Sequence, residues 1–216
     1  MNVRACFVDA AGTLLKPREP VGVTYARAAR ARGIDADPVV VEQRFRQAFR
    51  DHAARGNVQR GDGRAFWSPV VKIACDADDD RLVEDLWAHY LDPRAWWIDV
   101  QALNVLGQIA RTGVKLGIIS NWDTRLRILY NRFALDRMFP ILVCSAELDV
   151  EKPSVEIFRA ATTAAGVRPC EAVHIGDDPV NDVEGANRAG LVGLLYDEDM
   201  GWGSLPERIA RLRRFR

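Results

Sequence analysis

Acidic residues in two short segments are the side chains of this sequence best suited to chemistry. Asp9 ends an apolar run and is followed by a glycine–threonine turn, and Asp177, Asp178 and Asp182 follow a second apolar run. A carboxylate can attack phosphorus or carbon and form a covalent intermediate. Carboxylates crowded together are costly unless a cation compensates their charge, and Mg²⁺ prefers such oxygen ligands. The sequence therefore indicates a nucleophile at Asp9 and a Mg²⁺ site in the acidic loop.

Small polar and basic residues occur at other expected strand ends. Lys152, which precedes a proline, could neutralise charge that builds on a transferred group and on Asp9. Ser120, Asn121 and Thr13 offer groups that could hold a phosphate oxygen. These residues also have ordinary structural explanations. Serine and threonine often cap helices, and an aspartate such as Asp9 often forms a turn after a strand. A lysine before a helix is also commonly just exposed.

These residues lie along a chain that alternates strand and helix at short spacing. Such alternation predicts an α/β fold with a doubly wound, Rossmann-like parallel sheet. In such sheets ligands bind at the carboxyl ends of the strands, which is where the candidate residues fall. The expected strands span residues 3–9, 114–119, 141–144, 172–175 and 191–195, and the expected helices span 100–111, 125–133, 155–165 and 180–189.

Residues 17–98 have a different character, because apolar residues recur there at helical spacing. Helix signals include an alanine- and arginine-rich stretch that ends at Gly33, a start at Pro38, and a capping pair at Asp79 and Asp80. We expect an all-helical second domain inserted into an α/β core of residues 1–16 and 99–216. The connections between the two would run through residues 17–20 and 93–99.

Composition excludes several classes of function. The 216 residues contain 30 basic and 30 acidic side chains, and this balance gives no electrostatic reason to expect nucleic acid or an acidic membrane as a partner. No apolar stretch approaches the ~18 residues of a membrane-spanning helix, and no signal-peptide pattern precedes the first strand. The four cysteines lack metal-ligand spacing, and Cys6 and Cys144 lie in apolar runs that predict burial. We expect a cytoplasmic protein, monomeric or dimeric.

The segments around Asp9, Ser120, Lys152 and residues 175–182 resemble, in this order, the four motifs of the haloacid dehalogenase-like hydrolase superfamily. The helical insert resembles the C1-type cap of its subfamily I, and the segments 20–26 and 42–50 are similar to the REG-2-like branch. The resemblance implies a hydrolase that uses Mg²⁺ and no organic cofactor. Its expected substrate is a small phosphorylated molecule, cleaved through an aspartyl-phosphate.

The resemblance also implies a role for each matching position. Asp9 would attack the substrate and bind Mg²⁺, the backbone carbonyl of Ala11 would be a second ligand, and Asp177 a third. Asp182 would support the metal site or Lys152. The residues implied to orient the transferred group are Thr13, Ser120 and Asn121.

Ala11 departs from the first motif, which usually reads Asp-x-Asp. The second aspartate normally protonates the leaving oxygen and then activates water, and help of this kind is worth roughly 10²–10⁴ in rate. The protein could therefore be a phosphatase with a substitute acid or a good leaving group. Alternatives are a 2-haloacid dehalogenase-type hydrolase, a phosphonatase that uses Lys72, or a catalytically poor protein that binds a ligand or a partner. The retained Asp177 and Asp178 favour a metal and phosphoryl chemistry.

The tryptophans of the insert and its end carry less information. Trp67, Trp87, Trp96 and Trp97 are expected mostly in the core and the hinge. One of them could face the entrance of the site, and its identity does not follow from the sequence.

Overall fold

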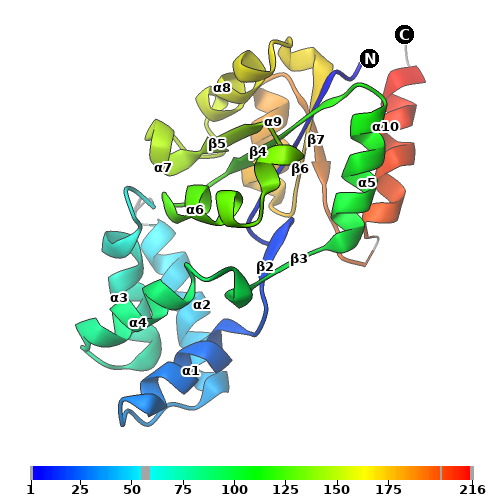
Figure 1. Ribbon diagram of the computed structural model, residues 1–216. Coiled ribbons are helices and arrows are strands. Elements are labelled where there is room, and N and C mark those ends of the chain that lie inside the picture. Colours follow the sequence, from blue (N-terminus) through cyan, green and yellow to red (C-terminus); the bar gives the residue numbers. More distant parts are fainter. Residues whose placement is uncertain (1, 55–58, 200, 215–216) are drawn as a thin grey trace.

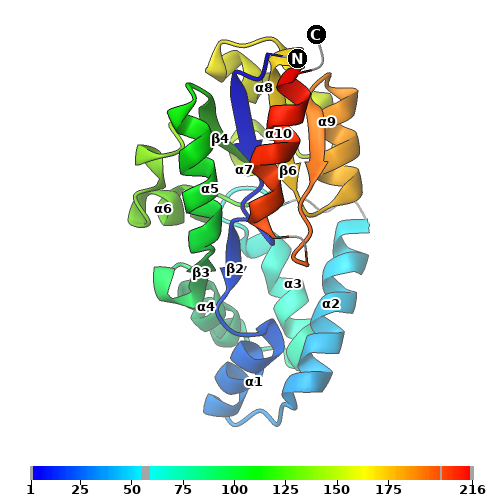
Figure 2. The same ribbon diagram turned by 90° about the vertical axis from the view of Figure 1, so that its right-hand side faces the viewer.

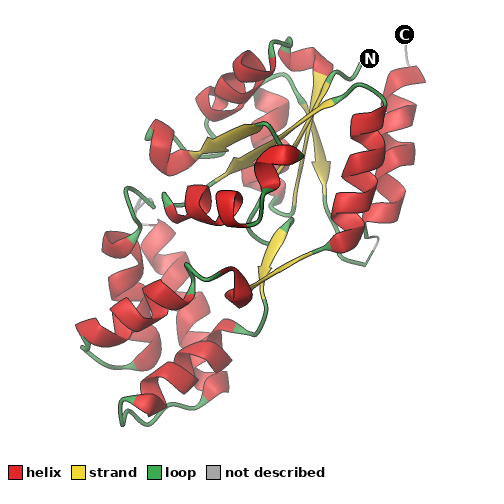
Figure 3. Ribbon diagram, in the orientation of Figure 1, coloured by secondary structure: helices red, strands yellow, loops and turns green. Residues whose placement is uncertain are grey.

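The expected apolar runs form one parallel sheet (Figures 1 and 3). The computed structural model describes residues 2–54, 59–199 and 201–214. All four strand pairings in the sheet are parallel, in the order β5-β4-β1-β6-β7, and the predicted α/β fold class is confirmed. The strands are β1 (Ala5–Val8), β4 (Lys115–Ser120), β5 (Ile141–Cys144), β6 (Ala172–Gly176) and β7 (Val192–Leu195).

Strand β1 lies at the centre of this sheet, and all its residues are buried. Its last residue, Val8, pairs with Ile118 on one side and Ile175 on the other. Because the three strands are parallel and end at nearly the same level, the residues after them meet at one edge. Topology thus places Asp9 between the segments that follow β4 and β6.

Helices cover both faces of the sheet (Figures 1 and 2). One apolar cluster joins one face to α5, α6 and α10, and another joins the opposite face to α8 and α9. The expected helix over 180–189 instead begins with a π-helical segment, Pro179–Glu184, before α9. The helices are α5 (Val100–Arg111), α6 (Arg125–Arg132), α7 (Ser145–Leu148), α8 (Val155–Ala165), α9 (Gly185–Arg188) and α10 (Leu205–Arg214), and 3₁₀ turns span Leu135–Arg137, Pro169–Glu171 and Trp202–Ser204.

Between β2 and β3 the described chain is helical, as expected, and it packs around its own apolar cluster. Asp79 caps the last of these helices, because its side chain accepts hydrogen bonds from two backbone N–H groups of the first turn. We call this group of helices the helical insert, and Figures 1 and 2 show it below the strand ends of the sheet. It consists of α1 (Val21–Ala31), α2 (Pro38–Ala54), α3 (Arg64–Cys75) and α4 (Asp80–His89).

A short antiparallel ribbon joins the insert to the rest of the molecule. It pairs β2 (Leu15–Pro17) with β3 (Trp96–Ile98), and a 3₁₀ turn at Pro93–Ala95 leads into β3. The sequence patterns did not predict this ribbon, because three residues per strand are too few to show alternation. The chain therefore leaves and re-enters the sheet domain side by side, while the exact boundaries at residues 17 and 98 stay a prediction.

Two further expectations concern the cysteines and membrane-spanning helices. Cys6 and Cys144 are buried free cysteines, as their apolar runs predicted. Within the parts of the chain that the structure describes, no helix has both the length and the apolar character needed to cross a membrane.

Candidate active site

Asp9 follows the central strand directly and is almost completely buried. Its backbone N–H donates to the carbonyl of Ile175 at 2.8 Å, which holds it beside β6. The chain then turns through Gly12, whose φ is +78°. A side chain here would be strained, and its Cβ would also lie 2.6 Å from Oδ2 of Asp177. Glycine at this position therefore lets the two acidic segments approach each other.

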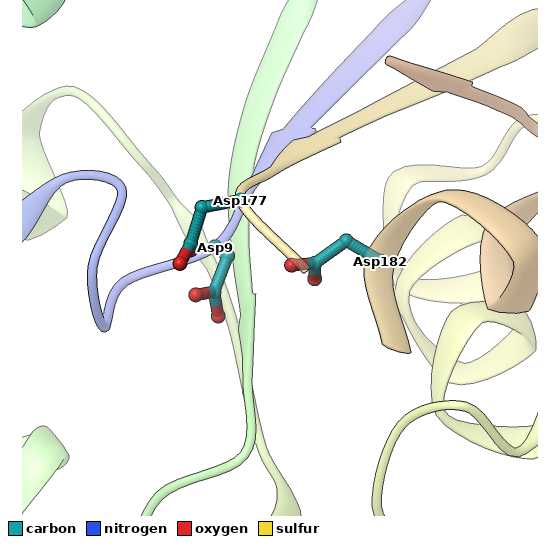
Figure 4. A group of neighbouring side chains, drawn as sticks. All are labelled: Asp9, Asp177 and Asp182. Atoms are coloured by element: carbon teal, nitrogen blue, oxygen red, sulfur yellow. The ribbon is translucent and has the colours of Figure 1, made fainter. Parts of the chain in front are cut away.

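Three carboxylates gather at this edge of the sheet (Figure 4). Asp9, Asp177 and Asp182 each offer one oxygen, and these oxygens all lie within 4.8 Å of one another. Asp9 and Asp182 are buried, whereas Asp177 is exposed. Such a set of hard oxygen donors, open to solvent on one side, fits a Mg²⁺ ion that keeps some of its waters.

Lys152 bridges the two buried carboxylates. Its Nζ donates to Oδ1 of Asp9 at 2.6 Å and to Oδ1 of Asp182 at 2.5 Å, and its side chain is 3% exposed. The structure thus joins three residues that the sequence separates by 143 and 30 positions. One ammonium between two carboxylates leaves the buried group with an excess negative charge.

Burial and this charge excess shift the pKa values. Burial raises the pKa of Asp9 to about 7, and repulsion from Asp182 adds to this rise, while Lys152 opposes it. Burial alone would also raise the pKa of Asp182, but the hydrogen bond with His174 and the charge of Lys152 outweigh it and hold that pKa well below its usual value. For Lys152, burial is outweighed by the two carboxylates, so its pKa is raised and it stays charged. Of the two buried carboxylates, Asp9 is the one more easily protonated.

Asn121 holds the backbone of Lys152 in place. Its Oδ1 accepts from the backbone N–H of Lys152 at 2.7 Å, and its Nδ2 donates to the carbonyl of Lys152 at 2.8 Å. These contacts point to positioning of the lysine, whereas the orienting role implied by the family resemblance stays a prediction.

We expect Asn121→Leu to lower kcat by about 10–100-fold with a smaller change in KM, because a displacement of about 1 Å in a catalytic group is costly. Steady-state kinetics of the purified variant test this. Asn131→Leu, at an exposed position of α6, is the matched control and should leave kcat unchanged. An unchanged kcat in Asn121→Leu would contradict the positioning role.

His174 is a member of the site that sequence reasoning missed. It is fully buried in β6, and its Nε2 lies 2.8 Å from Oδ1 of Asp182. Burial lowers the pKa of His174, so a neutral ring that donates from Nε2 suits this contact. A lone polar side chain in the apolar strand over 172–176 was the available signal. Asp182 also accepts from the backbone N–H of Asp178 at 3.1 Å, so it is held on several sides.

The remaining predicted residues differ in their hydrogen-bond partners. The hydroxyl of Thr13 donates to Oδ1 of Asp177 at 2.7 Å, so it supports an acidic residue. The buried hydroxyl of Ser120 has no hydrogen-bond partner among the described residues, which is unusual unless a ligand completes the site. Asp178 caps the π-helical segment, because its side chain accepts from the backbone N–H groups of Val180 and Asn181.

A cavity of about 550 Å³ opens above these residues. Its floor includes Asp9, Ala11, Lys152 and Asp177, and its opposite side is formed by residues of the helical insert. The volume falls in the usual range of small-molecule sites. A buried carboxylate, a buried cation and an acidic cluster thus face a cavity that could enclose a small molecule.

Comparison with known proteins decides the family. The description of the haloacid dehalogenase-like hydrolases matches residues 3–190, which contain all the candidate site residues described above. The chain belongs to this family. This haloacid dehalogenase-like hydrolase is also 33% identical over 206 residues to haloacid dehalogenase-like hydrolase domain-containing protein 3 of Xenopus laevis, covering 90% of this chain and 84% of that protein. The resemblance to that branch, predicted from residues 20–26 and 42–50, is confirmed.

Other similarities are more partial. A glyceraldehyde 3-phosphate phosphatase of Methanopyrus kandleri is 39% identical over 93 residues, which cover 40% of this hydrolase and 38% of that protein. The crystal structure of a phosphatase of the family from Thermococcus onnurineus has a TM-score of 0.67 at 21% identity and covers 96% of this chain and 98% of its own. A 2-haloacid dehalogenase from Pseudomonas syringae has a TM-score of 0.65 at 22% identity, with 97% and 99% covered. The two structures establish the shared fold.

Proposed function

We propose that this hydrolase is a Mg²⁺-dependent phosphatase that cleaves small phosphomonoesters through an aspartyl-phosphate on Asp9. The observation that carries the proposal is the contact of Asp9 with Lys152 inside an acidic cluster, at the floor of a cavity of small-molecule size. The similarity to a named phosphatase supports it. A dehalogenase would have no need of the clustered carboxylates, which favour a metal.

The ligands of Mg²⁺ in this proposal are the carboxylates of Asp9 and Asp177 and the backbone carbonyl of Ala11. When bound, the ion would neutralise charge on the phosphoryl group. Asp182 already accepts hydrogen bonds from Lys152, His174 and the backbone of Asp178. We therefore assign it chiefly to the support of Lys152.

The first chemical step would join an oxygen of Asp9 to phosphorus while the bond from phosphorus to the ester oxygen breaks. The ammonium of Lys152, already 2.6 Å from Asp9, would offset the negative charge of the group in transfer. Water would then attack the phosphorus of the aspartyl-phosphate, which releases phosphate and regenerates the carboxylate. The unpartnered hydroxyl of Ser120 is our candidate to orient the phosphoryl group.

Phosphate release from a panel of phosphomonoesters, with and without Mg²⁺, tests the proposal. We expect turnover that requires Mg²⁺ and that Asp9→Asn abolishes, while Asp35→Asn, at an exposed position of the insert, leaves it unchanged. Halide release from 2-haloacids without added metal would instead support a dehalogenase. Turnover that survives in Asp9→Asn would contradict the covalent mechanism.

The raised pKa of Asp9 predicts how stability depends on pH without metal. Between the ordinary pKa of an aspartate and about 7, the folded protein binds more protons at Asp9 than the unfolded chain does. Stability from this group therefore falls as pH rises across that interval and is lost above about pH 7. With chelator present, Asp9→Asn should melt a few °C above the parent at pH 8, and this gap should shrink at pH 5.

Thermal melts of both proteins, with EDTA and with excess Mg²⁺, make this measurement. Mg²⁺ should raise the Tm of the parent at pH 8 and have much less effect on Asp9→Asn, because binding to the folded state stabilises it. Equal Tm values at both pH values would contradict the expected protonation of Asp9.

A further inference from the structure

The cavity above Asp9 has two unlike ends. Its floor carries the charged residues of the site, whereas its walls on the side of the helical insert are mostly aromatic. Several rings touch one another, and the ring of Phe49 stacks on Trp67 with centroids 5.8 Å apart. The aromatic residues that line the cavity are Tyr25, Phe45, Phe49, Phe66, Trp67, Trp87, Tyr90, Trp96 and Trp122.

Three indoles of the insert and ribbon line the cavity, and the N–H group of each already donates to the protein. The Nε1 of Trp67 donates to Asp123 at 3.0 Å, that of Trp87 to the carbonyl of Asp62 at 2.9 Å, and that of Trp96 to the carbonyl of Tyr90 at 3.0 Å. These three indoles therefore present their apolar ring faces to a bound molecule, because their N–H groups already donate to the protein. Such walls suit an apolar or aromatic group better than a sugar with many hydroxyls.

The basic side chains that line the cavity are already paired with carboxylates of the protein. Among the described lining residues, the basic side chains are Lys152 and Arg125. The guanidinium of Arg125 donates twice to the buried Asp123, at 2.8 and 2.7 Å, and Lys152 is held by the two carboxylates of the site. Glu151 adds a further acidic group to the lining. A substrate with a second phosphate or a carboxylate would find no uncommitted cation among the described residues that line the cavity.

Ala11 lies in the lining of the same cavity, where it leaves the ester oxygen without the carboxyl group that commonly protonates it in this family. Where no other group supplies that proton, the oxygen departs as an anion, and the cost follows the pKa of its conjugate acid. A phenol has a pKa of about 10, whereas an alkyl alcohol lies near the value of about 16 for water. An aryl leaving group thus needs an acid far less than an alkyl one does.

Resting on the proposed function, we propose that the substrates are phosphate monoesters of apolar aromatic hydroxyl compounds. Asp9 attacks phosphorus, the bond from phosphorus to the aryl oxygen breaks, and its electron pair leaves on a phenolate that takes a proton from water. The rings of the insert bind the aryl group. The low pKa of the departing phenol makes up for the missing acid. The aromatic chamber and Ala11 are two separate observations that select the same chemical class.

Three substrates separate the two parts of this proposal: phenyl phosphate, benzyl phosphate and glucose 6-phosphate. Phenyl and benzyl phosphate both carry a ring, but only the first has an aryl oxygen as leaving group. We expect kcat for phenyl phosphate to exceed that for benzyl phosphate by about 100-fold or more. Glucose 6-phosphate should be poorest in kcat/KM. In Ala11→Asp the gap between phenyl and benzyl phosphate should nearly close.

Variants of the wall test the binding role. Phe49→Ala should raise KM for phenyl phosphate about tenfold, whereas Phe49→Tyr, which keeps the ring, should restore a KM close to that of the parent. Thermal melts of both variants verify that they are folded.

The outcomes distinguish failure of this inference from failure of the proposed function. If glucose 6-phosphate is cleaved with a kcat/KM equal to or above that of phenyl phosphate, the aryl class is overturned while the phosphatase stands. A phenyl-to-benzyl ratio near one would likewise overturn it. If neither the parent nor Ala11→Asp releases phosphate from any of the three compounds, the proposed function itself fails.

Discussion

Replacing Ala11 by aspartate is expected to raise kcat for alkyl phosphomonoesters by about 10²–10⁴-fold, which is the usual worth of general acid–base catalysis. Ala11 is exposed to the cavity that holds Asp9, so a carboxyl group introduced there could reach the departing oxygen and later the attacking water. The gain should be largest for the least acidic leaving groups. Measured kcat values for benzyl phosphate and other alkyl esters at saturating Mg²⁺ test this expectation.

Ala11→Asn is the matched control, because it has nearly the same shape but no titratable proton. It should show no gain over the parent. If Ala11→Asn accelerates turnover as much as Ala11→Asp does, the effect comes from packing or polarity, and the missing acid would not be what limits the rate.

Replacing Lys152 by methionine is expected to cause the largest combined loss. Its ammonium contacts both buried carboxylates, and breaking a buried ion pair by removing one partner costs about 3–5 kcal/mol. Catalysis should fall by about 10²–10³-fold or more, since the charge that offsets the transferred group is lost. Without Lys152 the pKa of Asp9 rises further, so the variant should be relatively more stable at pH 6 than at pH 8.

Chemical denaturation and kinetics at both pH values measure these effects. Lys72→Met is the control, because Lys72 pairs with two exposed aspartates on the surface of the insert, and surface pairs contribute less than about 1 kcal/mol. Lys152→Arg should not restore activity, since the planar guanidinium cannot place a point charge between the two oxygens. Equal losses in the Lys72 and Lys152 variants would refute the role assigned to Lys152.

The sequence predicted the parallel sheet and the edge at which the candidate site residues lie, because both depend on local signals. Short apolar runs such as that of β1 mark buried strands, and strands that alternate with helices must be parallel. Once the strands are parallel, Asp9, Ser120 and Asp177 fall at one edge. The sequence offered Lys152 as a cation that could neutralise charge on Asp9, and the structure adds their direct contact.

Other features depend on contacts that no local pattern reports. Asn121 could be placed near the site, but its hydrogen bonds with Lys152 depend on how two loops meet. His174 lies within β6, and its contact with Asp182 depends on how the loop after that strand folds back. The tryptophans Trp67, Trp87 and Trp96 line the cavity together, although only one was expected to face its entrance. Their orientation follows from how the insert sits on the sheet, which helical periodicity does not encode.

The β2–β3 ribbon carries an evolutionary consequence. Because Leu15 pairs with Ile98, the chain leaves for the insert and returns from it at nearly one point. A segment with adjacent ends can lengthen, shorten or be exchanged without pulling apart the strands that hold Asp9 and Asp177. The residues that we propose for catalysis and those that we propose for substrate selection are therefore free to change at different rates across relatives of this hydrolase.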